Sequence, residues 1–207
     1  MADQETVSER FSDEDATPAR KRPRPGERRL QILQTLASML EQPGAERVTT
    51  ASLAAKIGVS EAALYRHFAN KAQMFEGLID FVDQSVIGLI RQVTDREPAG
   101  PVQASRIVAL LLQFAEKNPG MSRVMIGDAL VLEHERLQER INLLFDKIEA
   151  QLRQSLKTSD SPTPTADAQV AASLLVAFMQ GRLQRFARSG FKRLPSEHLQ
   201  AALTKML

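Results

Sequence analysis

Apolar residues recur along most of the chain at intervals of three and four positions, the spacing of an amphipathic α-helix. The clearest stripe follows Asn70, an expected N-cap, and comprises Phe75, Leu78, Ile79, Val82, Val86, Leu89, Ile90 and Val93. No segment shows the alternation with a period of two that marks a half-buried strand. The pattern therefore predicts an all-α fold of about nine helices.

The same periodicity places the remaining helices. They are expected at about residues 26–42, 50–57, 61–67, 102–117, 121–130, 133–157 and 166–188, and from Ser196 to about 206. The core stripe of the first is expected to be Leu30, Leu33, Ala37 and Leu40, with Leu36 at its edge. The segment 102–117 is apolar on nearly all sides, which predicts a central, buried helix. Pro43 with Gly44 and a loop at 158–167 interrupt the pattern.

Residues 47–71, RVTTASLAAKIGVSEAALYRHFANK, contain two short helices separated by a tight turn. Thr49 is a suitable N-cap for the first, Gly58 ends it, and Ser60 caps the second. A helix, a short turn with glycine and a second helix form the helix-turn-helix pattern, in which the second helix enters the major groove of DNA. The sequence therefore predicts a DNA-binding protein.

The charge distribution agrees with this prediction. Residues 1–19 carry six acidic groups and one arginine, a net charge of −5, whereas residues 20–71 carry ten basic and four acidic groups, a net charge of +6. Neutralisation of phosphates supplies most non-specific DNA affinity, so positive charge is expected beside the motif. Without the motif, the same charges would be equally consistent with a solvent-exposed arm that binds nothing.

Three regions follow from these patterns. Residues 1–25 are polar and lack apolar periodicity, which predicts a disordered tail. Its cluster Arg20–Arg24 would lie along DNA or have no partner. Residues 26–72 are expected to form the helix-turn-helix DNA-binding domain, and residues 73–207 a helical domain for dimerisation and partner binding.

Several classes of function are unlikely from composition. The chain has no cysteine, which excludes disulfides and thiolate chemistry. It shows no secretory signal and no apolar run long enough for a membrane span, so a soluble, cytoplasmic protein is expected. His134, between Glu133 and Glu135, lacks a second histidine at metal spacing, and is expected to be a solvated residue at a helix start. We therefore expect no enzyme, no catalytic residue, no metal and no cofactor.

The DNA contacts are expected at three helix N-termini, where amides and hydroxyls attract phosphate. A cation in the first turn of a helix opposes the helix dipole unless an anion lies nearby, and a phosphate would supply that anion for Lys71. The expected phosphate contacts are Thr49, Thr50, Ser60, Tyr65, His67 and Lys71. Base contacts are expected to be few: Ala62 with a thymine methyl, Glu61 with cytosine and Arg66 with guanine. DNA shape would supply the remaining specificity.

The motif resembles that of the tetracycline-repressor (TetR) family of dimeric bacterial regulators: a cap Thr, then Leu-Ala, Gly-Val-Ser, Leu-Tyr, His-Phe and Lys at these spacings. The segments EKNPG at 116–120, ALVLEHERLQERIN at 129–142 and FDKIEAQLRQSL at 145–156 are similar to the nucleoid-occlusion group of that family. This likeness extends over most of residues 28–193. It implies a nucleoid-associated homodimer that binds a palindromic DNA site and, while bound, antagonises polymers of the division protein FtsZ.

The resemblance also implies two protein-binding surfaces. The dimer surface would come from the last two expected helices, 166–188 and 196–206, with Leu174, Leu175, Phe178 and Gly181 in contact; the alternative is that this face packs within its own subunit. The FtsZ-facing surface would comprise Phe81, Arg91, Lys117 and Asn118, a basic rim suited to an acidic peptide. Phe81 lies off its helix stripe and is expected to be exposed, with burial in the core as the alternative.

A second function stays open at this point. A transcription repressor released by a small apolar ligand would need a pocket in the helical body. Met121, Met125, Leu130 and Leu132 would line it, although these residue types more often belong to a core.

Overall fold

The computed structural model describes residues 26–42, 48–131, 133–157 and 164–207, and all regular structure in these ranges is helical. The elements are α1 (Glu27–Leu40), α2 (Thr50–Ile57), α3 (Glu61–Tyr65), α4 (Lys71–Thr94), α5 (Pro101–Lys117), α6 (Pro119–Met125), the 3₁₀ turn η2 (Asp128–Leu130), α7 (Glu135–Leu156), α8 (Pro164–Arg188) and α9 (Leu199–Met206). The predicted all-α fold is confirmed.

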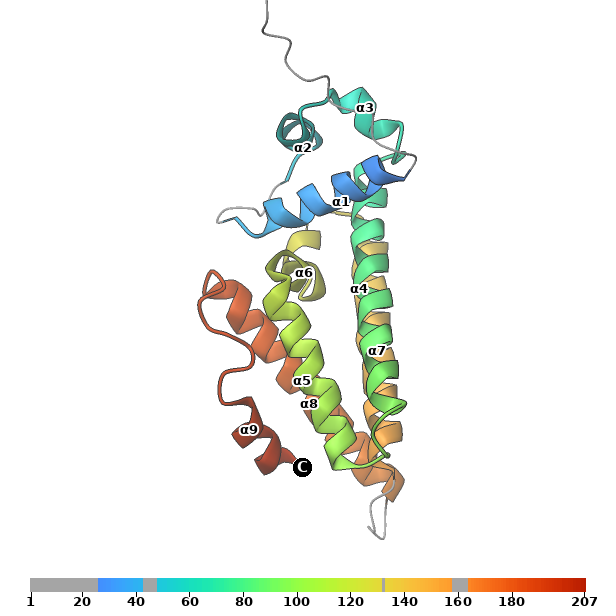
Figure 1. Ribbon diagram of the computed structural model, residues 1–207, viewed down its shortest axis with the longest axis vertical. Helices are drawn as coiled ribbons and strands as arrows, with labels where there is room; N and C mark the ends of the chain where they lie inside the picture. The colour runs from blue at the N-terminus through green and yellow to red at the C-terminus, as the bar shows by residue number, and fades with distance from the viewer. Residues whose placement is uncertain (1–25, 43–47, 132, 158–163) are drawn as a thin grey trace, which may run out of the picture.

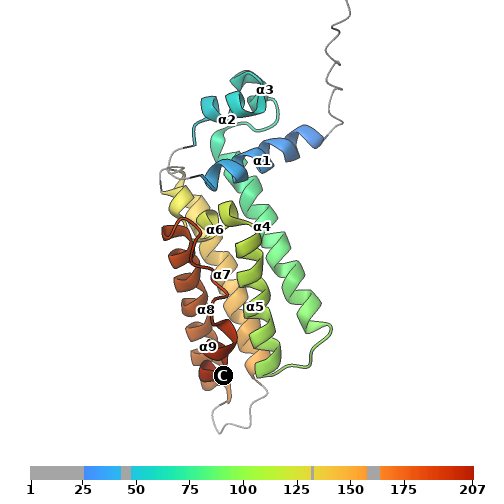
Figure 2. The same ribbon diagram turned by 60° about the vertical axis from the view of Figure 1, so that its left-hand side comes forward.

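Helices α1, α2 and α3 form a small head above an elongated body (Figures 1 and 2). α4 extends from the head along the whole body, packing against α1 at its upper end and against α5, α6 and α7 below. α7 and α8 make the most extensive helix pair of the body, and the short α9 lies beside α5. The domain boundary expected between residues 72 and 73 therefore falls inside a continuous helix.

The stripe predicted for α4 faces the core. All of its residues are buried except Leu89, which is half-buried, and they join the apolar residues of the head and the body in one cluster. Because α4 contributes to both parts of this cluster, the head has no core separate from that of the body.

The stripe predicted for α1 is correct at Leu40 and wrong at Leu30 and at Leu36, which was expected only at its edge. Leu30 is 53% exposed, whereas Ile32, Leu36 and Leu40 are buried. Two stripes with helical spacing overlap in this segment and share Leu40. Packing against α2, α4 and α6 buries the stripe of Ile32, Leu36 and Leu40. The spacing of apolar residues within α1 alone does not show which stripe these helices cover.

Other boundaries and burial differ from the expectations. α5 packs against α4, α6, α7 and α8, as expected for a central helix, but it is not apolar on all sides: Val102 is 67% exposed, and its outer face borders solvent near α9. α8 begins at Pro164, so residues 164–167 are helical rather than part of a loop. α9 begins at Leu199, after His198 in a left-handed conformation, and Ser196 is not its cap. The expectations for residues 1–25, for Pro43 with Gly44, for Leu132 and for 158–163 fall outside the described residues.

The head touches the body at Gly120, near the start of α6. A Cβ atom added there would lie 2.2 Å from the carbonyl oxygen of Ala37 in α1. Only glycine allows this approach of α6 to the α1 backbone. Among the described helices, none combines the length and hydrophobicity needed to span a bilayer.

Candidate nucleic-acid interface

The first helix of the motif is held by a reciprocal cap. The Thr49 hydroxyl oxygen accepts a hydrogen bond from the Ser52 amide at 3.0 Å, and the Thr49 amide donates to the Ser52 hydroxyl at 3.1 Å. These bonds satisfy two of the amide donors that a helix start leaves without partners. Gly58 ends α2 with φ 77°, the left-handed conformation that glycine adopts without strain. The turn of the motif is thus fixed by local chemistry.

α3 presents its exposed side away from the head. Leu64 and Phe68 are buried against the other head helices, and Ser60 accepts from the Ala63 amide at 3.3 Å. Glu61, Ala62, Tyr65, Arg66 and His67 are exposed, together with Thr49 and Ser60, and Thr50 is half-buried. α3 ends at Tyr65, two residues earlier than expected, so Arg66 and His67 follow the helix rather than extend it.

A chain of hydrogen bonds joins three of the candidate DNA contacts. The Thr50 hydroxyl donates to Glu61 Oε2 at 2.6 Å, and the Tyr65 hydroxyl donates to Thr50 Oγ1 at 3.4 Å. Glu61 therefore orients hydroxyl groups of α2 and α3. Glu61 is exposed, so its carboxylate can still accept a further hydrogen bond.

Arg29 of α1 also belongs to this surface, and the sequence reasoning missed it. Its Nη1 donates to the His67 carbonyl oxygen at 2.7 Å, and its guanidinium lies 4.0 Å from the centroid of the Phe68 ring. Arg29 thereby fixes the segment after α3. Arg29 lies within the basic residues 20–71, but its partners are 38 and 39 positions away along the chain, so local spacing did not reveal these contacts.

Lys71 has an anion beside it within the protein. Asn70 caps α4 by accepting from the Gln73 amide at 2.9 Å, and the Lys71 ammonium forms an ion pair with Glu133. The ammonium also lies 5.6 Å from the centroid of the Phe75 ring. A DNA phosphate was expected to supply the anion that this cation needs; in the structure Glu133 already supplies one.

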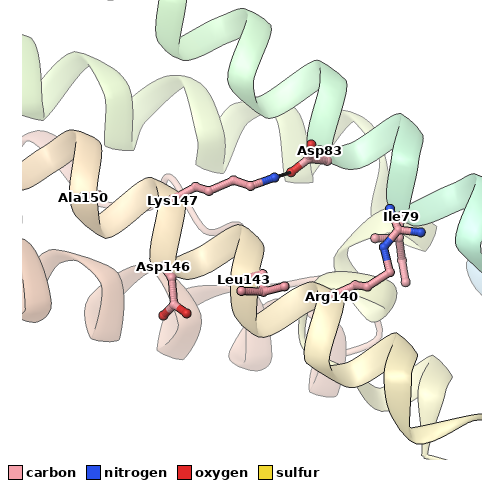
Figure 3. A pocket seen from close by; sticks show the side chains of 7 residues that line it. All are labelled: Ile79, Asp83, Arg140, Leu143, Asp146, Lys147 and Ala150. Carbon is pink, nitrogen blue, oxygen red and sulfur yellow. Dashed lines mark hydrogen bonds and ion pairs between the residues drawn. The ribbon is translucent and has the colours of Figure 1, made fainter.

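Three further ion pairs join α4 to α7. Glu76 pairs with Arg136 at 2.6 Å, and Asp83 with Lys147 at 2.8 Å; between them lies the pair of Asp80 and Arg140. Figure 3 shows Lys147 extending to Asp83 across a groove of about 360 Å³, whereas Asp146 points away from α4. The residue numbers rise together on both helices, so α4 and α7 run parallel.

A second groove lies where α1, α4 and α6 meet. Its volume is about 270 Å³, and its apolar lining includes Leu30, Leu33, Phe81 and Met121. The expected exposure of Phe81 is confirmed at 46%, and its ring lies 6.4 Å from that of Phe114 between centroids.

Of the other three residues expected on the FtsZ-facing surface, two lie at this groove and one lies away from it. Asn118 lines the groove and donates from Nδ2 to the Phe114 carbonyl oxygen at 2.7 Å, and Lys117 beside it is exposed. Arg91 is ten residues beyond Phe81 along α4, a rise of about 15 Å, so it lies apart from this groove.

One face of α8 is apolar and exposed. Val170 is 61% and Leu174 57% exposed, and Gly181 lies on the same stripe with open space where a Cβ would be. Phe178 at its edge is half-buried, with the Arg182 guanidinium 4.8 Å from its ring centroid. Leu175 is fully buried in its own subunit, so it is removed from the expected dimer surface.

The remaining candidates are structural. His134 is the exposed N-cap of α7 and accepts from the Arg136 amide at 3.3 Å, as expected for a residue at a helix start. Met121, Met125 and Leu130 are buried in the core. Within the described residues, no three His, Cys, Asp or Glu side chains gather closely enough to hold a metal ion.

Comparisons with known proteins give the family. Residues 32–78 match the model "Bacterial regulatory proteins, tetR family", and residues 101–206 match "Tetracyclin repressor-like, C-terminal domain" of the SlmA-like type. The chain is 49% identical over 177 residues to the nucleoid occlusion factor SlmA of Idiomarina loihiensis, covering 84% of this chain and 90% of that protein. It is 48% identical to SlmA of Shewanella woodyi, covering 84% and 89%.

Solved structures share the fold at lower identity. The regulator FadR from Bacillus halodurans superimposes with a TM-score of 0.70 at 15% identity, covering 88% of this chain and 95% of that one. AibR, solved with isovaleryl coenzyme A and operator DNA, superimposes with a TM-score of 0.67 at 14% identity, covering 86% and 97%. With these helices, this head and these relatives, the chain belongs to the SlmA family of nucleoid occlusion factors, within the TetR family of bacterial regulators.

Proposed function

We propose that this protein is a DNA-binding nucleoid occlusion factor. It binds palindromic chromosomal sites as a homodimer and, while bound, antagonises FtsZ polymers, so that no septum forms over the nucleoid. The observation that carries this proposal is the identity of about half of the aligned residues to SlmA proteins over 84% of the chain. The role is regulatory, not enzymatic, and places the protein in the cytoplasm on the nucleoid.

The head supplies the DNA contacts in this proposal. Thr49, Thr50 and Tyr65 bring hydroxyl groups to phosphates beside the N-termini of α2 and α3. On binding, the protons of Thr50 and Tyr65 would turn from Glu61 and Thr50 Oγ1 to phosphate oxygens. The side chains of Arg66 and His67 are exposed, and Arg29 bonds only the backbone carbonyl of His67, so both side chains are available to DNA. Ser60 and Lys71 complete the phosphate contacts, and Ala62 meets a base edge. Since one head buries little DNA, two heads are needed to bind two half-sites.

The face of α8 formed by Val170, Leu174, Phe178 and Gly181 supplies the dimer contact. An exposed apolar stripe beside a glycine allows two helices to pack closely. The same stripe on the second subunit would cover it about a twofold axis.

The groove around Phe81 supplies the contact with FtsZ. An exposed aromatic side chain at the edge of an apolar groove is a suitable anchor for a peptide. Lys117 adds positive charge beside it and Asn118 a polar wall, which suits an acidic segment. Arg91 would contact only a peptide that continues along α4.

A ligand-released repressor is the alternative, and the arrangement of the body supports it less. Three of the four residues expected to line a ligand pocket are packed in the core. The apolar groove near Phe81 is smaller than the usual range of ligand pockets, roughly 300–1,000 Å³.

A map of the chromosomal sites that the protein occupies tests the proposal. Many palindromic sites, mostly away from promoters and sparse near the replication terminus, support nucleoid occlusion. FtsZ sedimentation with and without a duplex from such a site should then show loss of polymers only when both protein and duplex are present. One or two sites beside a transporter gene or its own gene would favour the repressor and overturn the FtsZ assignment.

A further inference from the structure

The ion pair between Lys71 and Glu133 joins the first residue of α4 to the connection between η2 and α7. The Lys71 side chain is 31% exposed, and that of Glu133 only 11%. The Glu133 amide donates to the Leu130 carbonyl oxygen at 2.9 Å, and the next residue is the N-cap of α7. The pair therefore connects the part of α4 nearest the head to the start of a body helix.

This ion pair and the proposed phosphate contact use the same ammonium group. A carboxylate that is mostly buried beside Lys71 holds the cation in place, and its negative charge also repels an approaching phosphate. A phosphate that binds Lys71 must draw the ammonium away from Glu133 or share it with a like charge. Either arrangement weakens the link between α4 and the start of α7.

We propose that Glu133 is a positioning residue that restrains Lys71, so that DNA and Glu133 compete for one ammonium group. DNA binding then loosens the start of α7 from α4, while the three ion pairs further along the two helices persist. Glu133 remains at the N-terminus of α7, where the helix dipole stabilises an unpaired carboxylate. This inference rests on the proposed DNA-binding function, and it adds a route by which the body senses DNA.

The Glu133→Gln variant tests the competition, because the direction of the change in DNA affinity distinguishes it from a purely structural role. Freed from its partner, Lys71 should bind phosphate more strongly, so affinity for a mixed-sequence duplex should rise about threefold per half-site. A purely structural role for Glu133 would lower the affinity instead. Phosphate contacts do not depend on sequence, so the measurement needs no knowledge of the natural site.

Two further variants isolate the effect. Lys71→Met should weaken binding and reduce the log–log salt slope by about 1 per half-site. Glu133→Gln added to it should raise the affinity by much less than in the wild-type background, because only the direct repulsion of phosphate by Glu133 is then removed. Glu76→Gln is the matched control. It also removes a carboxylate that forms an ion pair between α4 and α7, here with Arg136 at 2.6 Å, but that pair includes no proposed DNA contact. It should leave the affinity for DNA unchanged.

Amide hydrogen exchange gives a second readout. In the wild-type protein, the duplex should speed exchange at the amides of residues 133–137, and in Glu133→Gln these amides should exchange at one faster rate with or without DNA. Glu133→Asp keeps the charge on a shorter side chain and should give an intermediate gain in affinity; it decides the question if the Gln variant does not fold.

Equal or weaker DNA binding by a folded Glu133→Gln variant overturns the inference, as does a gain in affinity that is undiminished in the Lys71→Met background. Failure of the proposed function looks different. In that case the wild-type protein itself would not bind duplex DNA with salt dependence.

Discussion

The Thr50 hydroxyl donates a hydrogen bond of 2.6 Å to the Glu61 carboxylate, so the first helix of the motif is bonded to the first residue of the second. Glu61 was expected to accept from a cytosine amino group. In the structure it accepts from the Thr50 hydroxyl, and Tyr65 extends the chain by one bond. The Glu61 carboxylate therefore orders two hydroxyl groups of the candidate DNA surface, and its negative charge would repel a nearby phosphate.

Glu61→Gln should therefore raise affinity for mixed-sequence DNA by a few-fold, on the order of one exposed charge interaction per half-site. The glutamine retains an acceptor for Thr50 but has no charge. Affinity for a natural palindromic site should rise less, so the ratio of specific to non-specific binding falls. Fluorescence anisotropy with both duplexes over a range of salt measures this ratio. An equal loss of both affinities would show that Glu61 only positions the hydroxyl groups of Thr50 and Tyr65 and that its charge does not repel DNA.

Leu174→Asp should separate the dimer into monomers. If two copies of this residue lie near the twofold axis, two carboxylates would be buried without partners, and dimerisation should weaken at least about a hundredfold. Sedimentation velocity measures the association. Leu143→Asp on α7 is the control, because Leu143 is 58% exposed, against 57% for Leu174, and lies off the α8 stripe. A dimer that survives Leu174→Asp would place the interface elsewhere.

Phe81→Ala should abolish antagonism of FtsZ polymers while leaving DNA affinity intact. The ring is about half exposed, so its removal costs less stability than loss of a core phenylalanine, for which about 3–5 kcal/mol is usual. Sedimentation of FtsZ with a bound duplex present gives the readout. Leu143→Ala removes another exposed apolar side chain, 58% accessible against 46% for Phe81, from the groove between α4 and α7 and should behave as wild type.

Gly120→Ala should destabilise the protein by about 1–3 kcal/mol, because the added methyl group collides with the α1 backbone. Chemical denaturation measures this change. Gly88 in α4 provides the comparison, since a Cβ there meets nothing within 4 Å. Gly88→Ala should stabilise the helix by roughly 0.5–1 kcal/mol. Equal stability of the two variants would mean that α1 and α6 separate readily.

The motif could be predicted from sequence because its determinants are local. Thr49, Ser60 and Asn70 each accept a hydrogen bond from an amide three positions ahead, a spacing visible in the chain itself. The same is true of Gly58, whose left-handed conformation ends α2. Such contacts depend on neighbours in sequence, so pattern and structure agree there.

The errors and omissions depend on distant contacts. Leu30 and Ile32 fit helical stripes equally well, and only packing against other helices distinguishes them. The partner of Arg29 lies 38 residues away and that of Lys71 62 residues away. No local spacing encodes those distances, so Lys71 was paired with DNA alone and Arg29 was overlooked.

α4 has 24 residues in one unbroken helix that begins beside the DNA-reading surface and is bonded along one side to α7. Such a helix is about 36 Å long, so a tilt of only about 5° about its far end would move the head by about 3 Å. That displacement is close to the rise of one base pair. If two such heads bind neighbouring half-sites, as proposed, the stiffness of α4 would set how much variation in the spacing of those half-sites they tolerate.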